Sequence, residues 1–245
     1  MPIELLPREH SMLIFAHRGA SADAPENTLL AIDQALHQKA DGIEIDVYQL
    51  GNELVVIHDR WVSRTTNGNR LLADYTLEEL QTLDAGQGEF VPTLWQVLQR
   101  VQGQCLMNIE VKGVHDISLI NACINKAVSQ LNFKPEQFIV SSFNHHMLLA
   151  FKSMAPAIRI GALTGSIPLD YAQFAEKLQA YSVNADLSFV NEAFVNDAHS
   201  RGLKIFVYTV DEPEDLLRLQ AWGIDGVFSN GPAKAKWVFA KNAKN

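Results

Sequence analysis

The sequence is short of cysteine, of basic charge and of long hydrophobic runs. Two cysteines, Cys105 and Cys123, are too few to hold 245 residues together by disulfides, so we expect a reducing compartment. The chain has 20 lysines and arginines against 28 aspartates and glutamates, and its net charge of −8 argues against nucleic acid and stable membrane association. No apolar run approaches the roughly 18 residues of a membrane span.

The start of the chain also lacks a leader pattern. Residues 1–10 place acids and prolines where a signal peptide needs a basic stretch followed by an apolar one. With 47% hydrophobic and only 20% charged residues, the chain can build a substantial core. We therefore predict a cytoplasmic globular protein, a monomer or homodimer, in which residues 1–245 form one domain.

Apolar, β-branched runs alternate with amphipathic segments along nearly the whole chain. The expected strands are 12–16, 42–48, 105–111, 138–142, 158–163, 182–185, 203–209 and 226–229. The expected helices are 27–39, 93–102, 116–130, 144–154, 170–180, 191–200, 213–222 and 231–241. Strands that alternate with helices pair in parallel, because each crossover is helical.

Two folds fit this alternation, an open doubly wound sheet and a closed barrel. The units are regular, the length suits eight of them, and no glycine-rich dinucleotide fingerprint follows the first strand, where residues 19–22 lack the further glycines. We predict a (β/α)₈ TIM barrel.

One segment interrupts the regular alternation of expected strands and helices. More than thirty residues separate His58-Asp59 from the helix expected at Thr93, and loops of that length are usually functional. The pattern Thr76-Leu-Glu-Glu79 predicts a capped short helix inside it. We interpret residues 60–92 as a small insertion after strand 2, lying over the barrel mouth. Near the other end of the chain, Asp211 before Glu212-Pro213 is expected to cap a helix.

Acidic side chains gather at the predicted carboxyl ends of neighbouring strands, where barrels carry their chemistry. Glu44 and Asp46 are two residues apart, so both point to one face of a strand, inside the barrel, while the aliphatic residues between them face the helices. The same alternation turns Glu110 and Lys112 inward. Three converging carboxylates repel one another, and one divalent cation, Mg²⁺ or Ca²⁺, resolves that conflict. The alternative is that they only form ion pairs with Arg18 and Lys112.

Two histidines at strand ends, His17 and His58, have the side chain best suited to proton transfer near neutral pH. Arg18 and Lys112 supply positive charge for an anionic oxygen. The remaining histidines are expected to be structural, with the adjacent pair 145–146 exposed to solvent: His10, His37, His115, His145, His146 and His199.

No nucleophile for covalent catalysis stands out. Neither Ser141 nor Ser142 lies in a Gly-x-Ser-x-Gly turn, Cys105 opens a strand at the opposite end of the barrel, and Cys123 falls within a helix. A cation, an arginine and two histidines together suit a phosphate ester, with one imidazole activating the attacking oxygen and the other protonating the departing one.

These residues form ordered motifs, and the chain resembles the glycerophosphodiester phosphodiesterases from about residue 12 to 240. The motifs are His17-Arg18-Gly19, Pro25-Glu26-Asn27-Thr28, Glu44-Ile45-Asp46-Val47, His58-Asp59, Glu110-Val111-Lys112, Ser141-Ser142-Phe143, Val207-Tyr208-Thr209-Val210 and Trp222-Gly223-Ile224-Asp225-Gly226. The resemblance implies a TIM barrel with an insertion after strand 2 that acts on small, water-soluble deacylated phospholipids in the cytosol.

The resemblance also implies roles for particular residues. Metal ligands would be Glu44, Asp46 and Glu110, and the acid–base pair would be His17 and His58, without saying which histidine is the acid. The residues implied on the substrate side, for phosphate and its surroundings, are Arg18, Lys112, Glu26, Phe143 and Tyr208.

Two departures from the family pattern stand out. Tyr208 occupies a position where many members carry tryptophan, and Ser229-Asn230-Gly231-Pro232 replaces a more usual Thr-Asp. We expect neither to touch the metal or proton-transfer groups.

Three questions about the function stay open at this point. The attacking oxygen is either water or a neighbouring hydroxyl of the substrate. A phospholipase that acts on intact lipid is a second hypothesis, disfavoured by the charge of −8. A barrel that binds phosphodiesters without cleaving them is a third, disfavoured by the two intact histidines.

Overall fold

The computed structural model describes residues 12–242. The predictions made for the opening residues, including the absence of a leader and the structural role of His10, lie outside the described part of the chain.

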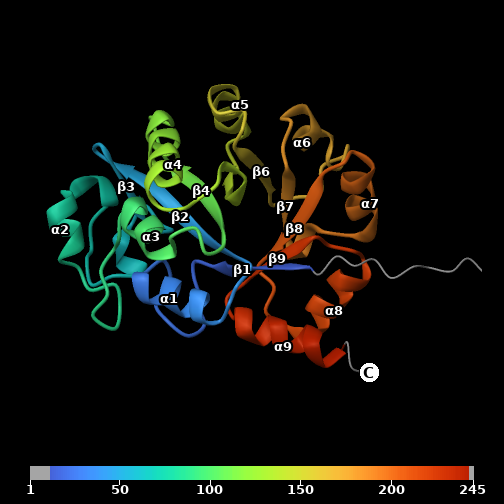
Figure 1. Ribbon diagram of the computed structural model, residues 1–245, viewed down its shortest axis with the longest axis horizontal. Helices are drawn as coiled ribbons and strands as arrows, with labels where there is room; N and C mark the ends of the chain where they lie inside the picture. Colours follow the sequence, from blue (N-terminus) through green and yellow to red (C-terminus); the bar gives the residue numbers. More distant parts are fainter. Residues whose placement is uncertain (1–11, 243–245) are drawn as a thin grey trace, which may run out of the picture.

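Eight parallel strands close into a barrel (Figure 1). Each strand pairs with its neighbour around the ring, and β1 closes the circle by pairing with both β9 and β2. The barrel strands are β1 Leu13–His17, β2 Gly42–Leu50, β4 Leu106–Gly113, β5 Phe138–Ser142, β6 Arg159–Thr164, β7 Ser182–Asp186, β8 Lys204–Tyr208 and β9 Gly226–Ser229. The prediction of a TIM barrel is confirmed, with strand ends shifted by a residue or two.

Helices surround the barrel and follow the strands in the predicted order (Figure 1). They are α1 Leu29–His37, α3 Leu94–Val101, α4 Ser118–Gln130, α5 His145–Met154, α6 Gln173–Lys177, α7 Glu192–Ser200, α8 Pro213–Ala221 and α9 Pro232–Asn242. The expected helix over 170–180 is much shorter, because residues 169–172 form a turn in which Tyr171 has a positive φ of 47°. No helix within residues 12–242 has the length and apolarity needed to cross a bilayer.

Residues 60–92 form the predicted insertion and lie beside an extra strand, β3 Glu53–Val56, which pairs antiparallel with β2. The insertion contains the short helices η1 Val62–Arg64, η2 Leu72–Asp74 and α2 Leu77–Gln81, the last with the predicted capping box at Thr76. Its apolar side chains pack in a separate cluster with Val55 of β3 and with Ile57, which follows that strand. Figure 1 shows α2 at the far edge of the molecule, next to β3.

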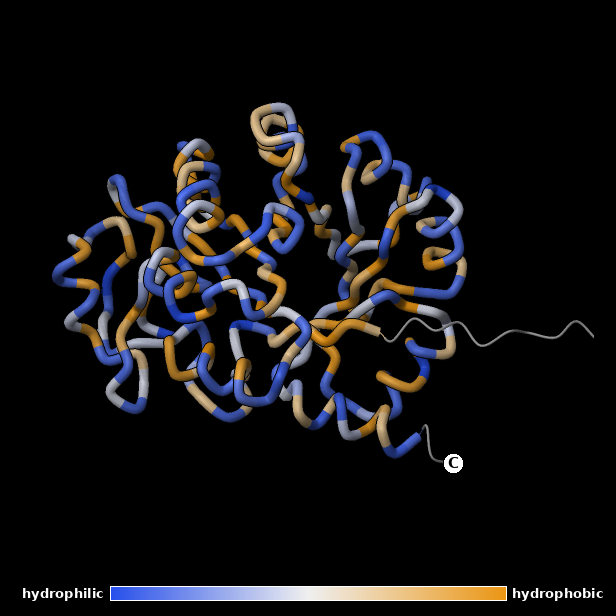
Figure 2. The backbone as a smooth tube through the Cα atoms, in the orientation of Figure 1, coloured by the Kyte–Doolittle hydropathy of each residue, from blue (hydrophilic) through white to orange (hydrophobic). Residues whose placement is uncertain are grey.

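The alternation predicted for the strands is confirmed. Ile43, Ile45 and Val47 of β2 are buried in the main cluster, among side chains from the surrounding helices, while Glu44 and Asp46 face the other way. Figure 2 shows how hydrophobic and hydrophilic residues alternate along the outer helices, as expected for helices with one buried side.

Aromatic rings fill part of the barrel interior. Phe15, Phe206 and Phe228 pack together with ring centroids 5.1 to 6.2 Å apart. Phe15 lies two residues before His17 on β1, so both share the inward side of that strand. The rings thus form an apolar layer beneath the polar carboxyl ends of the strands.

Candidate active site

Three carboxylates meet at the carboxyl ends of β2 and β4. Asp46 stands opposite Glu110 in the parallel register. Glu44, Asp46 and Glu110 each offer an oxygen, and these oxygens lie within 4.8 Å of one another. Glu44 is 3% exposed and Asp46 only 1%. The structure therefore brings together the three acidic residues that the sequence singled out.

The cluster is electrostatically unfavourable by itself. Burial, reinforced by the charges of Asp46 and Glu110, raises the pKa of Glu44 well above its usual range. Burial and the charge of Asp46 likewise raise the pKa of Glu110. Glu44 Oε1 is buried and accepts no hydrogen bond from any group within residues 12–242. Oxygen donors in this number and with this surplus of negative charge fit a hard divalent cation such as Mg²⁺ or Ca²⁺.

Arg18 and Lys112 border the acidic cluster, so the predicted ion pairs are present as well. The Arg18 backbone N–H donates to Glu44 Oε2 at 2.9 Å, and its Nε lies 3.3 Å from Asp46 Oδ2. Lys112 Nζ lies 2.7 Å from Glu110 Oε1 and 3.4 Å from Asp46 Oδ1. These cations balance part of the charge, but they leave the buried Glu44 Oε1 without a partner.

His17 ends β1, next to Arg18. Its Nδ1 lies 2.8 Å from Asn230 Oδ1. Since an amide oxygen only accepts hydrogen bonds, Nδ1 carries the proton and Nε2 is bare. Burial of the ring, together with the nearby charge of Arg18, lowers the pKa of His17 to about 4. The imidazole is therefore neutral near pH 7 and ready to accept a proton.

His58 follows β3 and is held differently. Its Nδ1 lies 2.7 Å from Asp59 Oδ1, and its Nε2 accepts a hydrogen bond from Lys112 Nζ at 3.1 Å. Burial opposes ionisation of Asp59, but hydrogen bonds from Arg64 and His58 outweigh it and lower the pKa of that carboxyl. The partner of this histidine is thus a carboxylate.

The insertion contributes Arg64, which the sequence analysis missed. Its guanidinium donates two hydrogen bonds of 2.8 Å to the carboxylate of Glu26 and also pairs with Asp59. Arg18 Nη1 donates to the same Glu26 at 2.8 Å. Burial works against ionisation of Glu26, but Arg64 and Arg18 together lower its pKa to about 2. No sequence motif marks Arg64, because its partners lie 5 and 38 residues away.

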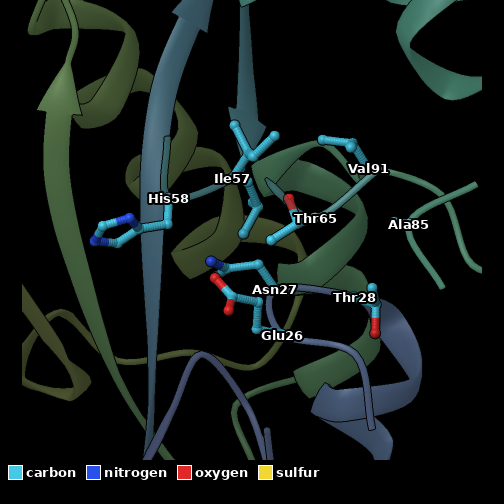
Figure 3. A pocket seen from close by; sticks show the side chains of 9 residues that line it. Glu26, Asn27, Thr28, Ile57, His58, Thr65, Ala85 and Val91 are labelled. Carbon is cyan, nitrogen blue, oxygen red and sulfur yellow. The ribbon is translucent and has the colours of Figure 1, made fainter. Parts of the chain in front are cut away.

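Asn27, in the motif of residues 25–28, contacts one of the three carboxylates. It is buried, with a positive φ of 59°, and its Nδ2 donates to Asp46 Oδ2 at 2.9 Å while its Oδ1 accepts from the Asp46 backbone N–H at 3.3 Å. Figure 3 shows Glu26 and Asn27 side by side, with the ring of His58 pointing away from Val91. Asn27 therefore orients one of the three acidic groups.

Phe143 and Tyr208 form an aromatic edge near Lys112. Their rings meet at 89° with centroids 6.2 Å apart, and Lys112 Nζ lies 6.0 Å from the Phe143 ring centre. Phe143 is 50% exposed, whereas the Tyr208 hydroxyl donates to the carbonyl of Thr164 at 3.0 Å. Both predicted residues thus lie within reach of the site.

Three expectations are wrong. Asn230 was expected to touch no proton-transfer group, yet it bonds His17. Asp211 does not cap α8, because its carboxylate instead accepts hydrogen bonds from Ser229 at the end of β9 and from Asn230, which follows it. His145 is half-buried, stacked on Phe174 with its Nε2 2.8 Å from the Leu163 carbonyl oxygen.

Among residues 12–242, the remaining histidines and the two cysteines are not part of the carboxylate cluster. His37, His115 and His146 are exposed, and His199 pairs with Asp225 at 2.8 Å. Both cysteines are free thiols, and burial raises the pKa of each to about 12, so neither is suited to act as a nucleophile.

Comparison with known proteins identifies the family. The model of the glycerophosphoryl diester phosphodiesterase family matches residues 17–234. The chain belongs to this family. A glycerophosphodiester phosphodiesterase from Caldanaerobacter subterraneus is 40% identical over 231 residues, covering 90% of this chain and 94% of that protein. One from Bacillus altitudinis is 33% identical, covering 91% of this chain and 96% of the other.

A solved structure gives the same answer. A phosphodiesterase from Oleispira antarctica, determined in complex with the product sn-glycerol 3-phosphate, superimposes with a TM-score of 0.85 at 30% identity. The match covers 93% of this chain and 96% of that one. The resemblance inferred from the motifs is confirmed, and the chain is an enzyme of the phosphodiesterase class.

Proposed function

We propose that this enzyme hydrolyses glycerophosphodiesters, the deacylated forms of phospholipids, to sn-glycerol 3-phosphate and an alcohol. The observation that carries the proposal is the clustering of three carboxylates, two of them buried, with His17 and His58 held in place by Asn230 and Asp59. The chain's relatives by sequence are named for this activity, and a structural relative was solved with that product. The substrate class is therefore a small, water-soluble phosphodiester.

One divalent cation, Mg²⁺ or Ca²⁺, would be held by Glu44, Asp46 and Glu110. When bound, it supplies positive charge for the ligands and for the nonbridging oxygens of phosphate. Arg18 and Lys112 would neutralise the remaining phosphate charge, as cations beside the cluster with polar hydrogens to donate. Phe143 and Tyr208 would border the glycerol or alcohol portion.

The two histidines would share the proton transfers. His17, neutral with a bare Nε2, takes the proton of the attacking oxygen, which is water or a neighbouring hydroxyl of the substrate. The attacking oxygen forms a new bond to phosphorus, the bond from phosphorus to the departing alcohol oxygen breaks, and His58 gives a proton to that oxygen. If the attacking oxygen is the substrate's hydroxyl, the product of this step is a cyclic phosphate, which water then opens to sn-glycerol 3-phosphate. This assignment requires Lys112 to turn from His58 Nε2 towards phosphate as substrate binds, and Nε2 to take up a proton.

Release of alcohol from glycerophosphocholine, glycerophosphoethanolamine and diglycerol phosphate tests this function directly. We expect turnover with Mg²⁺ or Ca²⁺, none in excess chelator, and recovery when the cation is restored. Full activity in chelator would contradict the assignment of the carboxylates. A protein that binds these substrates without releasing alcohol would support the binding-protein hypothesis, and turnover of intact phospholipid vesicles alone would support the phospholipase.

A second measurement addresses the cation without turnover. A cation at about 100 times its dissociation constant stabilises the fold by about 2.7 kcal/mol, which for a chain of this size raises Tm by about 5–10 °C. We expect this shift in the wild type and its loss in Glu44→Gln, which keeps the shape of the side chain but removes its charge. An equal shift in both proteins would exclude Glu44 as a ligand. Cytoplasmic location and a monomeric or homodimeric state stay predictions.

A further inference from the structure

His17 is hydrogen-bonded to a network of polar side chains, Asn230, Asp211 and their neighbours, that has no part in the proposed reaction. Asn230 follows β9, and its Oδ1 accepts hydrogen bonds from His17 Nδ1 and from Ser21 Oγ, both at 2.8 Å. Its Nδ2 donates to Asp211 Oδ2 at 2.6 Å. Asp211 follows β8, and its Oδ1 also accepts from the Asn230 backbone N–H at 2.8 Å and from Ser229 Oγ at 2.9 Å.

The charge of Asp211 decides which group donates and which accepts in each of these hydrogen bonds. A carboxylate only accepts hydrogen bonds, so the side-chain group of Asn230 that faces it must be the NH₂. The amide oxygen of Asn230 is then forced towards His17, and because that oxygen only accepts, His17 must carry its proton on Nδ1. The bare nitrogen is therefore Nε2. An amide is needed at residue 230, since it must donate on one side and accept on the other.

We propose that Asn230, oriented by Asp211, is a positioning residue that fixes the tautomer and ring orientation of His17. The tautomer follows from the hydrogen bonds alone. Only its consequence, that Nε2 of His17 accepts a proton in the reaction, rests on the proposed function. Aspartate at residue 230 would place two carboxylates 2.6 Å apart, in contact with one another and without a hydrogen between them. Exchanging the two residues, with Asn at 211 and Asp at 230, restores one donor and one acceptor at each contact.

The first test reads the tautomer without turnover. Two-bond ¹H–¹⁵N spectra of the full-length protein in chelator at pH 7.5 separate protonated from bare ring nitrogens, and His17→Gln identifies the His17 signals by their loss. We expect a protonated Nδ1 and a bare Nε2 in the wild type. Asn230→Ala should populate both tautomers, whereas Asn125→Asp, on the exposed face of α4, should leave the spectrum unchanged. A wild-type tautomer in Asn230→Ala overturns the proposal.

The second test uses the exchange. In the presence of Mg²⁺, we expect Asn230→Ala and Asn230→Asp to lower kcat about 10–100-fold with KM within about threefold of wild type, the range typical of lost orienting partners. The double variant Asp211→Asn/Asn230→Asp should recover to within about fivefold of wild type, because the two positions are coupled.

The results of these tests distinguish failure of this inference from failure of the proposed function. A double variant that folds, by its circular dichroism and Tm, but is no better than Asn230→Asp overturns the proposal. If the double variant does not fold, the spectra of Asn230→Ala decide. Failure of the wild type to release alcohol counts against the proposed function and leaves the tautomer result standing.

Discussion

The two sides of the barrel mouth hold their imidazoles by different means. His17 bonds a neutral amide from Asn230, 213 residues away, whereas His58 bonds the carboxylate of its own neighbour, Asp59. Both acceptors orient the ring, and a carboxylate stabilises a positive charge on it more strongly than the amide oxygen of Asn230 does. In the proposed reaction His17 accepts a proton and His58 gives one up, so the two roles fall on rings with different acceptors at Nδ1.

The two sides also differ in how they depend on the insertion. Arg64 of the insertion pairs with Asp59 and with Glu26, so the His58 side is tied to residues 60–92. The His17 side is tied instead to the segments that follow β8 and β9, through Asp211 and Asn230. Each histidine is thus oriented by a different part of the molecule, and the two can be perturbed separately.

The largest expected effect is the loss of either imidazole. His17→Gln and His58→Gln should each lower kcat about 10²–10⁴-fold, because each removes one proton-transfer group. The measurement is the steady-state release of alcohol from glycerophosphocholine, with circular dichroism to confirm folding. His37→Gln, on the exposed end of α1, is the matched control and should keep wild-type turnover. Turnover within tenfold of wild type in either site variant would remove that residue from the mechanism.

A smaller effect is expected from the partner of His58. Asp59→Asn keeps an acceptor for Nδ1 but removes the charge, so we expect a loss in kcat of about 10–100-fold. Arg64→Gln should cost less, about 2–10-fold, since it removes contacts to Asp59 and Glu26 but leaves both carboxylates in place. Comparison of kcat for the two variants shows whether the Asp59–His58 contact or the contacts of Arg64 matter more for turnover. A larger loss in Arg64→Gln than in Asp59→Asn would show that Arg64 acts on the substrate.

The smallest effect concerns stability in acid and not turnover at neutral pH. The pKa of His17 is about 4 in the folded protein, below its ordinary 6.5, so the unfolded chain binds a proton more readily between these values. The free energy of unfolding should therefore decrease as the pH drops from 6.5 towards 4, by an amount on the order of 3 kcal/mol from this residue.

Urea unfolding of the metal-free protein at pH 7 and pH 4.5 measures this loss. His17→Gln carries no titrating ring, so its stability should decrease less than that of the wild type over the same interval. Equal decreases in the two proteins would show that the His17 ring titrates normally.

Much of the barrel and of the acidic cluster followed from local pattern. Strand alternation placed Glu44, Asp46 and Glu110 inward, and the adjacent His58-Asp59 pair is visible in the sequence itself. Arg64 and Asn230 were missed as orienting residues because neither belongs to a local pattern that includes its partners. Helix α6 was overestimated because its start depends on the turn at residues 169–172.

Asp211 is a residue for which the local sequence pattern and the structure indicate different partners. Its position before Glu212-Pro213 is typical of a helix cap, and a cap is the partner that local sequence offers. Parallel pairing of β8 with β9 places Asp211 beside the polar groups of Ser229 and Asn230 instead.

The sequence by itself determined which side chains line the mouth, because a period of two along each strand decides the inward face. The tertiary structure alone decided which residues far apart in the sequence are partners, since pairing β1 with β9 brings residues from the two ends of the chain into contact. Local periodicity carries no information about contacts at that separation, and the orientation of His17 depends on one of them.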